Sequence, residues 1–413
     1  MKIAVVHNVP AGGAKRVLYS FGKYLHQRGH TIDLFTTTAH DDGLFSLSTF
    51  ANKTVKYELK KISPLGNVRP YFIKVYLNLF QKIIFLRQLN ILYKKIAAEV
   101  DTGAYDIVFV HNCVTQAPFL LQHLNSLTVY YAHEPLRSAY EPDIDIPDQP
   151  DSLLSKIKFL LPEPAIRLQR YITKTADRKN ILSAQYVFSN SYYTRESLYK
   201  AYGILATVSY PGVDIDSFRP LDLPRKNFVL SIGSIAPIKK HDFVIDSLAR
   251  INKDIRPNLI IIGNFTSKNY MDNLLERAKS KDVTVELKLL ISDEELLKLY
   301  NEAKMVIYPP VMEPFGLVPL EAMACGTPVI GVKEGGIRET IVDGETGLLI
   351  NRDEDQCAQA IEKLLRDDNL SKELGRKGRE YVCQKWNWEK CTEQLEENFK
   401  RILAQNKKGK SIT

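Results

Sequence analysis

Residues 305–332 read MVIYPPVMEPFGLVPLEAMACGTPVIGV, in which two short apolar runs, MVIYPP and TPVIGV, flank a helical stretch. Gly316 permits a close approach of the backbone, Pro319 suits the first turn of a short helix, and Gly326 suits its end. A strand, a helix and a second strand in this order are typical of two parallel strands joined by a crossover helix. The segment therefore predicts a parallel sheet covered by helices.

The same alternation of β-branched runs and helical segments fills both halves of the chain, separated by a turn-rich stretch at 211–227. The rhythm predicts two Rossmann-like α/β domains, 1–210 and 211–385, facing each other across a central cleft lined by strand-to-helix loops. The helical pattern at 386–405 is expected to cross back to the first domain, and the polar tail 406–413 to lie outside both. The expected strands are 3–7, 31–38, 106–112, 128–134 and 186–191, then FVLSIGS, NLIIIGN, VTVELKLL, MVIYPP and TPVIGV.

The composition is that of a globular protein. Apolar residues make up 45% and charged residues 25% of the 413, which excludes collagenous and largely disordered chains. The five cysteines form no CxxC pair, so neither a disulfide framework nor a zinc site is indicated. The N-terminal MKIAVVHNVP is interpreted as a strand rather than a signal peptide, and no apolar run reaches 18 residues. We expect a cytoplasmic protein whose membrane contact, if it has any, is peripheral.

The basic excess is confined to one half of the chain. Residues 1–210 contain 25 Lys and Arg against 16 Asp and Glu, whereas the remainder contains 31 against 32. Such asymmetry indicates an anionic partner for the first half, of which a phosphorylated substrate, a membrane surface and nucleic acid are examples. Incidental surface charge is the alternative interpretation.

The segment 313–331 carries the clearest functional pattern. Its loop should bring a helix N-terminus to the cleft, where free N–H groups and the helix dipole favour an anion such as a diphosphate. Glu313 on the loop and Glu321, expected in the first helical turn, are placed to flank such a group. Carboxylates next to an anion act as acceptors for hydroxyls, so the pattern indicates a sugar nucleotide.

These residues resemble the family 4 retaining glycosyltransferases, which have the GT-B fold and are also known as group 1 glycosyl transferases. The E-x7-E spacing of Glu313 and Glu321 and the following EGGIRETIVDGETGLLI look like the family almost residue for residue. Weaker matches cover nearly the whole chain: PAGGAKR in the first loop, YYAHEP at 130–135, SNSYYTRESL at 189–198 and YPGVDIDSF at 210–218.

The resemblance implies roles for several residues. Glu321 would accept hydrogen bonds from the ribose hydroxyls, and Glu313 with the backbone of Phe315, Gly316 and Leu317 would hold the donor sugar and phosphates. Lys239, in GSIAPIKKHDF, would reach the diphosphate from the loop that begins at Gly233. The family commonly has an Arg directly after this glycine, where the chain has Ser234. Lys240 or Arg16 would have to supply the missing charge, or the donor is held more weakly.

In the first domain, Gly12 and Gly13 lie between the first strand and a helix, but GxGxxG is absent, which disfavours a dinucleotide site. The resemblance implies that this loop closes over phosphates and acceptor. His111 and His133 end two successive strands and could both face the cleft, with a structural role as the alternative interpretation. His133, in YYAHEP, joins Glu313 and Lys239 as a catalytic candidate.

No metal or other cofactor is expected. DxD-type pairs occur at 143/145, 214/216 and 353/355, each in an acidic or turn-like loop, and we interpret all three as accidental. Lys239 and the helix N-terminus are expected to neutralise the leaving group instead.

Residues 71–93 contain sixteen apolar and seven polar residues, so their apolar face is unusually wide. A core helix packed on the first sheet is one interpretation. The other is an interfacial helix that reaches a lipid-linked acceptor at an anionic membrane surface.

Together the patterns predict an enzyme that moves a hexose from a nucleoside diphosphate sugar to a carbohydrate or lipid-linked acceptor, with retention of configuration, in glycoconjugate or polysaccharide biosynthesis. Nucleic acid is not an expected partner. A catalytically weak or inactive sugar-nucleotide-binding protein, motivated by Ser234, and an epimerase or phosphorylase of the same fold are the alternatives.

Overall fold

The computed structural model describes residues 1–10, 12–37, 45–59, 71–113, 116–140, 161–264 and 268–410. The chain divides into two compact units. The first consists of Met1–Asn190, Thr194–Ser209 and Gln394–Thr413, and the second of Ser191–Tyr193 and Tyr210–Glu393.

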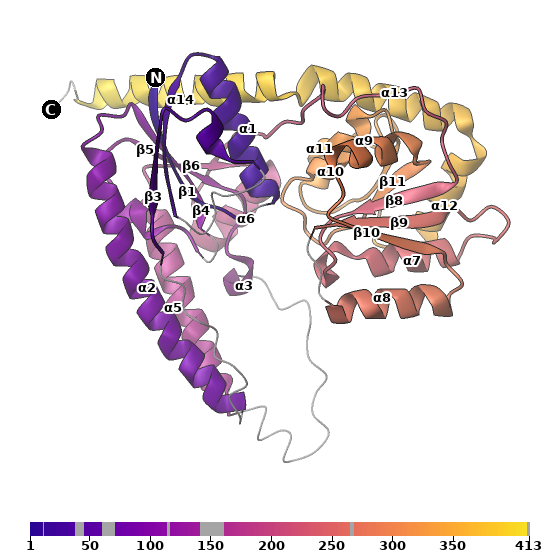
Figure 1. Ribbon diagram of the computed structural model, residues 1–413, viewed down its shortest axis with the longest axis horizontal. Helices are drawn as coiled ribbons and strands as arrows, with labels where there is room; N and C mark the ends of the chain where they lie inside the picture. The colour runs from indigo at the N-terminus through magenta and orange to yellow at the C-terminus, as the bar shows by residue number, and fades with distance from the viewer. Residues whose placement is uncertain are drawn as a thin grey trace. The chain divides into compact units, whose positions relative to one another are not determined.

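The first unit is built on a parallel sheet whose strands lie in the order β3-β2-β1-β4-β5-β6-β7 (Figure 1). The chain starts in the middle, at β1, builds outward to β3 and then returns to the other side of β1 with β4. The strand rhythm in the sequence did not reveal the short edge strands β3 and β7. The strands are β1 (Lys2–Asn8), β2 (Thr31–Thr37), β3 (Lys53–Tyr57), β4 (Ile107–Cys113), β5 (Thr128–Ala132), β6 (Tyr186–Ser189) and β7 (Thr207–Val208).

Helices cover both faces of this sheet. Alternate strand side chains, among them Val6, Val108 and Tyr130, pack with residues of α2, α5 and α6 in one buried cluster. On the other face, Phe21 of α1 contacts Tyr131. The helices of the unit are α1 (Gly13–Gln27), α2 (Tyr71–Asp101), α3 (Arg137–Tyr140), α5 (Glu163–Leu182) and α6 (Tyr192–Tyr202), with 3-10 turns η1 (Leu47–Thr49) and η2 (Phe119–Gln122).

The helix α14 (Trp388–Lys410) completes the first unit from the far end of the chain. Phe399 is fully buried, with its ring 5.2 Å from that of Phe109 and 6.2 Å from that of Phe188. Glu396 accepts a hydrogen bond from Arg28, which follows α1, at 2.6 Å. The last helix thus belongs to the core of the first unit.

The first residues of the segment expected to cross back, 386–393, count with the second unit. Trp386 is 1% exposed and packs in the core of the second unit with Val213 and Phe315. Its carbonyl accepts a hydrogen bond from the backbone N–H of Val213. Only residues from Gln394 onward count with the first unit.

The second unit has a six-stranded parallel sheet in the order β10-β9-β8-β11-β12-β13. It too begins in the middle, with β8, and β13 is a strand that the sequence rhythm missed. The strands are β8 (Phe228–Ile232), β9 (Asn258–Gly263), β10 (Val285–Leu289), β11 (Met305–Tyr308), β12 (Val329–Val332) and β13 (Leu348–Ile350).

Two buried clusters hold helices on the two faces of the second sheet. One combines strand residues such as Val229 and Ile261 with α7, α8 and α12, and the other combines Leu230 and Val306 with α9, α10 and α11. The helices are α7 (His241–Ala249), α8 (Lys268–Ser280), α9 (Asp293–Glu302), α10 (Leu317–Ala324), α11 (Ile337–Thr340), α12 (Glu354–Arg366) and α13 (Asp368–Lys385), with the 3-10 turn η3 (Pro237–Lys239).

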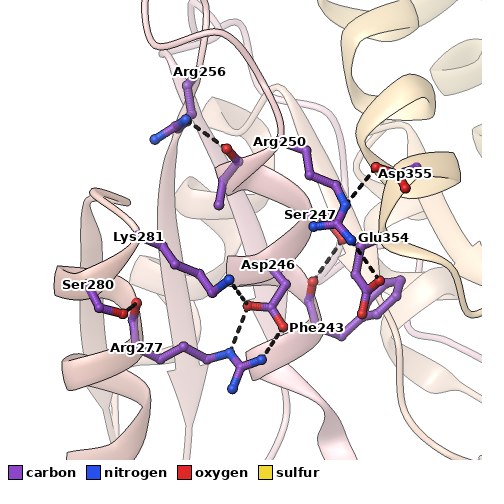
Figure 2. A network of polar contacts seen from close by, with 11 residues as sticks. Phe243, Asp246, Ser247, Arg250, Arg256, Arg277, Ser280, Lys281, Glu354 and Asp355 are labelled. Atoms are coloured by element: carbon purple, nitrogen blue, oxygen red, sulfur yellow. Dashed lines mark hydrogen bonds and ion pairs between the residues drawn. The ribbon is translucent and has the colours of Figure 1, made fainter.

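Figure 2 shows how polar contacts fasten α7 to its neighbours. The Asp246 carboxylate pairs with Arg277 of α8 and with Lys281 just beyond it. Hydrogen bonding and charge from Arg277 lower the pKa of Asp246 although burial raises it. Arg250 at the end of α7 pairs with Glu354 and Asp355 of α12. Because α7 follows directly after Lys239 and Lys240, these contacts also help to fix the positions of the two lysines.

Candidate functional site

The strand order places a binding site at the carboxyl ends of β8 and β11. In an open parallel sheet, ligands bind where the strand order reverses, because the loops after the two central strands diverge to opposite faces. In the second sheet these loops are 233–240 after β8 and 309–316 after β11. They contain the lysine and the first glutamate singled out by the sequence.

Lys239 and Glu313 meet at this point. Lys239 Nζ donates to Glu313 Oε2 at 2.7 Å, and the side chains are 23% and 18% exposed. Gly233 makes room for the lysine, because a Cβ there would lie 3.2 Å from Lys239 Cγ and Cδ. The structure therefore brings a partly buried cation and carboxylate together at the end of β8.

Backbone contacts hold the loop that carries Glu313. The N–H of Val311 donates to the carbonyl of Ile238 at 2.9 Å, and the N–H of Gly336 donates to the carbonyl of Glu313 at 2.7 Å. A Cβ at Gly335, which has a φ of +55°, would lie 2.3 Å from the carbonyl oxygen of Glu313. Only glycine fits so close an approach, so the EGG sequence after β12 positions Glu313.

Arg352 fixes the same loop from the other side. Its guanidinium donates to the carbonyl oxygens of Pro309 at 2.7 Å and Pro310 at 3.0 Å, and pairs with Glu334 at 2.8 Å. One side chain thereby ties the end of β11 to the loop after β12.

The N-terminus of α10 opens at the end of the Glu313 loop. Gly316 precedes the helix in a left-handed conformation, with φ 97° and ψ 76°, and has no side chain to cap it. The first turn contains no acidic residue. Its N–H groups and the positive end of the helix dipole are the elements that bind phosphate at helix N-termini. Phe315 is buried against Trp386, so only its backbone faces this region.

Glu321 lies deeper than the sequence suggested. It is the fifth residue of α10, one turn later than expected, and is 3% exposed. Tyr300 donates its hydroxyl hydrogen to Glu321 Oε2 at 2.7 Å. Burial, followed by the charges of Glu313 and Glu321, raises the pKa of Tyr308 well above its ordinary value, so this tyrosine stays a neutral hydroxyl beside both carboxylates. The two glutamates thus belong to one polar cluster.

Ser234 and Lys240 complete the loop after β8. His241 Nε2 lies 3.2 Å from the Ser234 carbonyl, and burial lowers the His241 pKa to about 4. This histidine is therefore neutral near pH 7 and does not replace the missing arginine. Lys240 has a left-handed φ of 53° at the N-cap of α7 and makes no ion pair with any residue of the described ranges. Among the described residues, Lys240 is the cation nearest to Ser234 in the sequence that forms no ion pair with a carboxylate.

The first unit has an equivalent switch point between β1 and β4. Gly12 and Gly13 follow β1 at the start of α1, where an added Cβ would meet no atom within 4 Å. Arg16 lies in the first turn of α1, with its guanidinium 5.9 Å from the centre of the Phe45 ring.

His111 and His133 come together in the first unit, but they are buried. His111 Nδ1 lies 3.2 Å from His133 Nε2, and the side chains are 0% and 8% exposed. Burial lowers the pKa of His111 well below its ordinary value and that of His133 to about 4. Both rings are therefore neutral at pH 7, and His111, which the sequence offered as a residue that could face the cleft, has no exposed surface in the first unit.

Two of the DxD pairs have structural explanations. Asp214 accepts hydrogen bonds from the backbone of Asp216 and Ser217, and Asp353 caps the N-terminus of α12 through Gln356. The pair 143/145 lies outside the described residues. Within the described part of the chain, no group of three or more His, Cys, Asp or Glu side chains is arranged to hold a metal ion.

Sequence reasoning missed Tyr300, Tyr308 and Arg352. All three contact the loop or the carboxylates of the candidate site from segments outside 313–331. Of the three, only Tyr308 could have been found from the sequence, because it is the last residue of a strand that ends at the switch point. Tyr300 and Arg352 are brought to the site only by tertiary packing.

Two Rossmann-like units, each built on a parallel sheet, are the architecture of the GT-B fold. The model of Glycosyltransferase Family 4 matches residues 11–217 and that of Glycosyl transferases group 1 matches residues 214–381. The chain belongs to this family, as its resemblance predicted, and is a glycosyltransferase.

Full-length relatives support the same assignment. N-acetyl-alpha-D-glucosaminyl L-malate synthase of Bacillus anthracis is 24% identical, with 99% of each chain covered. Sucrose-phosphate synthase from Thermosynechococcus elongatus has a similar structure, with a TM-score of 0.73, 20% identity and coverage of 98% of this chain and 100% of that one. HepE of Anabaena, solved in complex with UDP and glucose, has a TM-score of 0.67 at 19% identity and covers 97% and 100%.

Proposed function

We propose that this glycosyltransferase moves a hexose from a nucleoside diphosphate sugar to a carbohydrate or lipid-linked acceptor with retention of configuration, in glycoconjugate or polysaccharide biosynthesis. The observation that carries the proposal is the Lys239–Glu313 pair beside the uncapped N-terminus of α10 at the switch point of the second sheet. The pair supplies a cation for phosphate and a carboxylate for sugar hydroxyls within one small region.

In this proposal the diphosphate binds at the N-terminus of α10, on the N–H groups that follow Gly316. Lys239 supplies positive charge to the diphosphate, and Lys240 takes over the role of the arginine absent at Ser234. Arg16 remains a further candidate for this role. A nucleoside diphosphate donor also agrees with the UDP bound in the structural neighbour HepE.

Glu321 is proposed to accept the ribose hydroxyls. Tyr300 holds one oxygen of its carboxylate, which restricts the rotation of the side chain and so orients the other oxygen. Glu313 is proposed to accept hydroxyls of the transferred sugar, while the backbone of Phe315 to Leu317 contacts the phosphates.

The proposed transfer breaks the bond between the anomeric carbon and the diphosphate oxygen. The acceptor oxygen forms its new bond on the same face of the sugar, and its proton passes to the departing diphosphate. The chain lowers the barrier by positioning the reactants and by stabilising the negative charge that grows on the diphosphate. The neutral His133 is suited to hydrogen bonding with an acceptor hydroxyl rather than to acting as a cation.

A thermal-shift panel of UDP, GDP and ADP and of their hexose conjugates tests the donor. A nucleotide present at one hundred times its dissociation constant stabilises a protein by about 2.7 kcal/mol. The nucleotide with the cognate base should therefore give the largest shift in melting temperature. Proton NMR of the product formed from an α-linked donor then reports the anomeric configuration. If all anions raise the melting temperature equally, the proposed donor site is wrong. If the product is β-linked, the proposed retention is wrong.

Ser234 motivates a second candidate function, a sugar-nucleotide-binding protein with little or no catalysis. It predicts thermal stabilisation by a sugar nucleotide without release of the nucleoside diphosphate. An epimerase would convert the sugar of the donor without transferring it. Chromatography of the nucleotide pool after incubation with the stabilising donor distinguishes transfer, epimerisation and binding alone.

A further inference from the structure

The helix α2 has two apolar faces. Val75, Leu79 and further buried residues pack inward, with the first two contacting Ala165 of α5. The opposite side of its first half is also apolar and is open. Six side chains, each between 38% and 63% exposed, make up what we call the outer face: Ile73, Tyr76, Leu77, Phe80, Ile83 and Ile84.

The outer face is a continuous stripe. At 100° per residue, these six positions fall within an arc of about 120° on the helix, opposite the buried positions. Figure 1 shows α2 and α5 running side by side. A helix that is apolar on all sides is normally covered on all sides, so an occupant is expected on this stripe.

The charges of α2 indicate what that occupant is. Residues 71–98 contain five basic residues and no acidic one. Arg87, Lys94 and Lys95 follow the apolar stripe on the same side of the helix and are exposed. None of the three pairs with a carboxylate in the described part of the chain. Apolar side chains followed by unneutralised cations are complementary to an anionic lipid surface.

We propose that the outer face of α2 inserts into the interfacial layer of an anionic membrane, with Arg87, Lys94 and Lys95 on the lipid headgroups. No helix in the described ranges is long and apolar enough to cross a bilayer, and the contact proposed is peripheral. The inference rests on the proposed function in one respect, since it favours the lipid-linked class of acceptor. Lys82 is half-buried and lies on the packed side of the helix, so it is not part of this surface.

Co-sedimentation of the full chain with vesicles tests the contact. We expect binding to vesicles of phosphatidylcholine with 30 mol% phosphatidylglycerol at low salt, and much weaker binding to phosphatidylcholine alone. Each basic side chain near such a surface changes partitioning by about fivefold, so Arg87→Glu, Lys94→Glu and Lys95→Glu together should lower it at least ~100-fold. A matched triple variant, Lys200→Glu, Lys279→Glu and Lys372→Glu, changes the net charge equally on other helices and should bind nearly as wild type does.

The apolar part is tested by Ile73→Ser, Phe80→Ser and Ile84→Ser together, for which we expect at least a tenfold loss that persists at high salt. Leu205→Ser, at a 67% exposed position after α6, is the control. Light scattering of the wild type without vesicles identifies the competing occupant: a dimer dissociated by the apolar variant means that a second copy covers the face. That result, or wild-type protein left in the supernatant with anionic vesicles, overturns the proposal.

Release of nucleoside diphosphate from the donor, measured on the same samples without vesicles, separates this inference from the proposed function. Wild-type protein that releases the nucleoside diphosphate but does not bind anionic vesicles contradicts the membrane contact alone. Vesicle binding without any release contradicts the transferase chemistry alone.

Discussion

Lys239 and Glu313 reach the same point from two different strand-to-helix loops, and their Nζ and Oε2 atoms lie 2.7 Å apart. Their segments are far apart in the sequence, yet β8 and β11 are neighbours in the sheet. The ion pair holds each side chain at the switch point and keeps one cation next to the N-terminus of α10.

Changing Lys239 to Ala should weaken binding of the cognate nucleoside diphosphate by about 1.5 to 3 kcal/mol, because a charged hydrogen-bond donor is removed. Calorimetry measures the dissociation constant. Lys226→Ala is a matched control, since Lys226 also pairs with a glutamate, Glu302, at 2.8 Å but elsewhere in the second unit. Equal affinities for the two variants would exclude Lys239 from the donor site.

Changing Glu321 to Ala should also weaken nucleotide binding by about 1.5 to 3 kcal/mol, through the loss of a charged acceptor for a ribose hydroxyl. Tyr300→Phe should cost less, about 1 kcal/mol, because it removes only one neutral hydrogen bond that orients the carboxylate. Calorimetry with the nucleoside diphosphate and with its 2′,3′-dideoxy analogue distinguishes the two effects. If the analogue loses no affinity relative to the natural nucleotide in the wild type, the assigned role of Glu321 is wrong.

Turnover should continue in excess chelator, because α10 and the lysines supply the positive charge that a metal ion would otherwise provide. The rate of nucleotide release with EDTA, compared with added magnesium or manganese, is the measurement. Activity that disappears with chelator and returns with either ion would show that the charge at the diphosphate is supplied differently.

Acid should destabilise the first unit through Glu396. Burial opposes ionisation of this carboxyl, but hydrogen bonds from Lys400 and Arg28, with the charges of Arg28 and His30, lower its pKa to about 2. In the unfolded chain the pKa is near 4.5, so the stabilisation is complete above that pH and is lost as the pH falls toward 2.

Glu396→Gln should therefore be less stable than wild type by roughly 2 kcal/mol at pH 7, and the difference should shrink between pH 4.5 and pH 2.5. The pKa of His30 is lowered chiefly by burial, while Glu396 raises it, so His30 adds its own loss of stability below about pH 6.5, and this loss should be larger in the variant. Urea unfolding at several pH values measures the difference, with the exposed Glu397→Gln as control. A stability gap that does not change with pH would mean that packing, rather than charge, accounts for the effect.

The fold was predictable because its signals are local. Apolar runs of four to seven residues, separated by helical segments, indicated most strands of both sheets. The edge strand Thr207–Val208 is only two residues long, and Lys53–Tyr57 alternates with polar residues. Such strands form because a neighbouring strand offers hydrogen bonds, and their own sequence contributes little.

The candidate site could be proposed from the sequence where its residues lie within one segment, as Glu313, Phe315 to Leu317 and Glu321 do. Contacts made by residues from other segments could not be predicted. Tyr300 of α9 reaches Glu321 of α10 only because both helices pack in the same buried cluster. The burial of individual side chains could not be predicted from the sequence either. Nothing in YYAHEP shows that His133 is 8% exposed, or that its ring contacts His111.

The placement of α14 has a consequence for synthesis on the ribosome. Phe109 and Phe188 leave the ribosomal tunnel long before Phe399, which is made only after the entire second unit. During that interval the nascent first unit lacks both the phenylalanine that covers these rings and the carboxylate of Glu396 that Arg28 requires. The second unit has all its residues before the first one does, so the amino-terminal half of this chain is the last to acquire its complete set of native contacts.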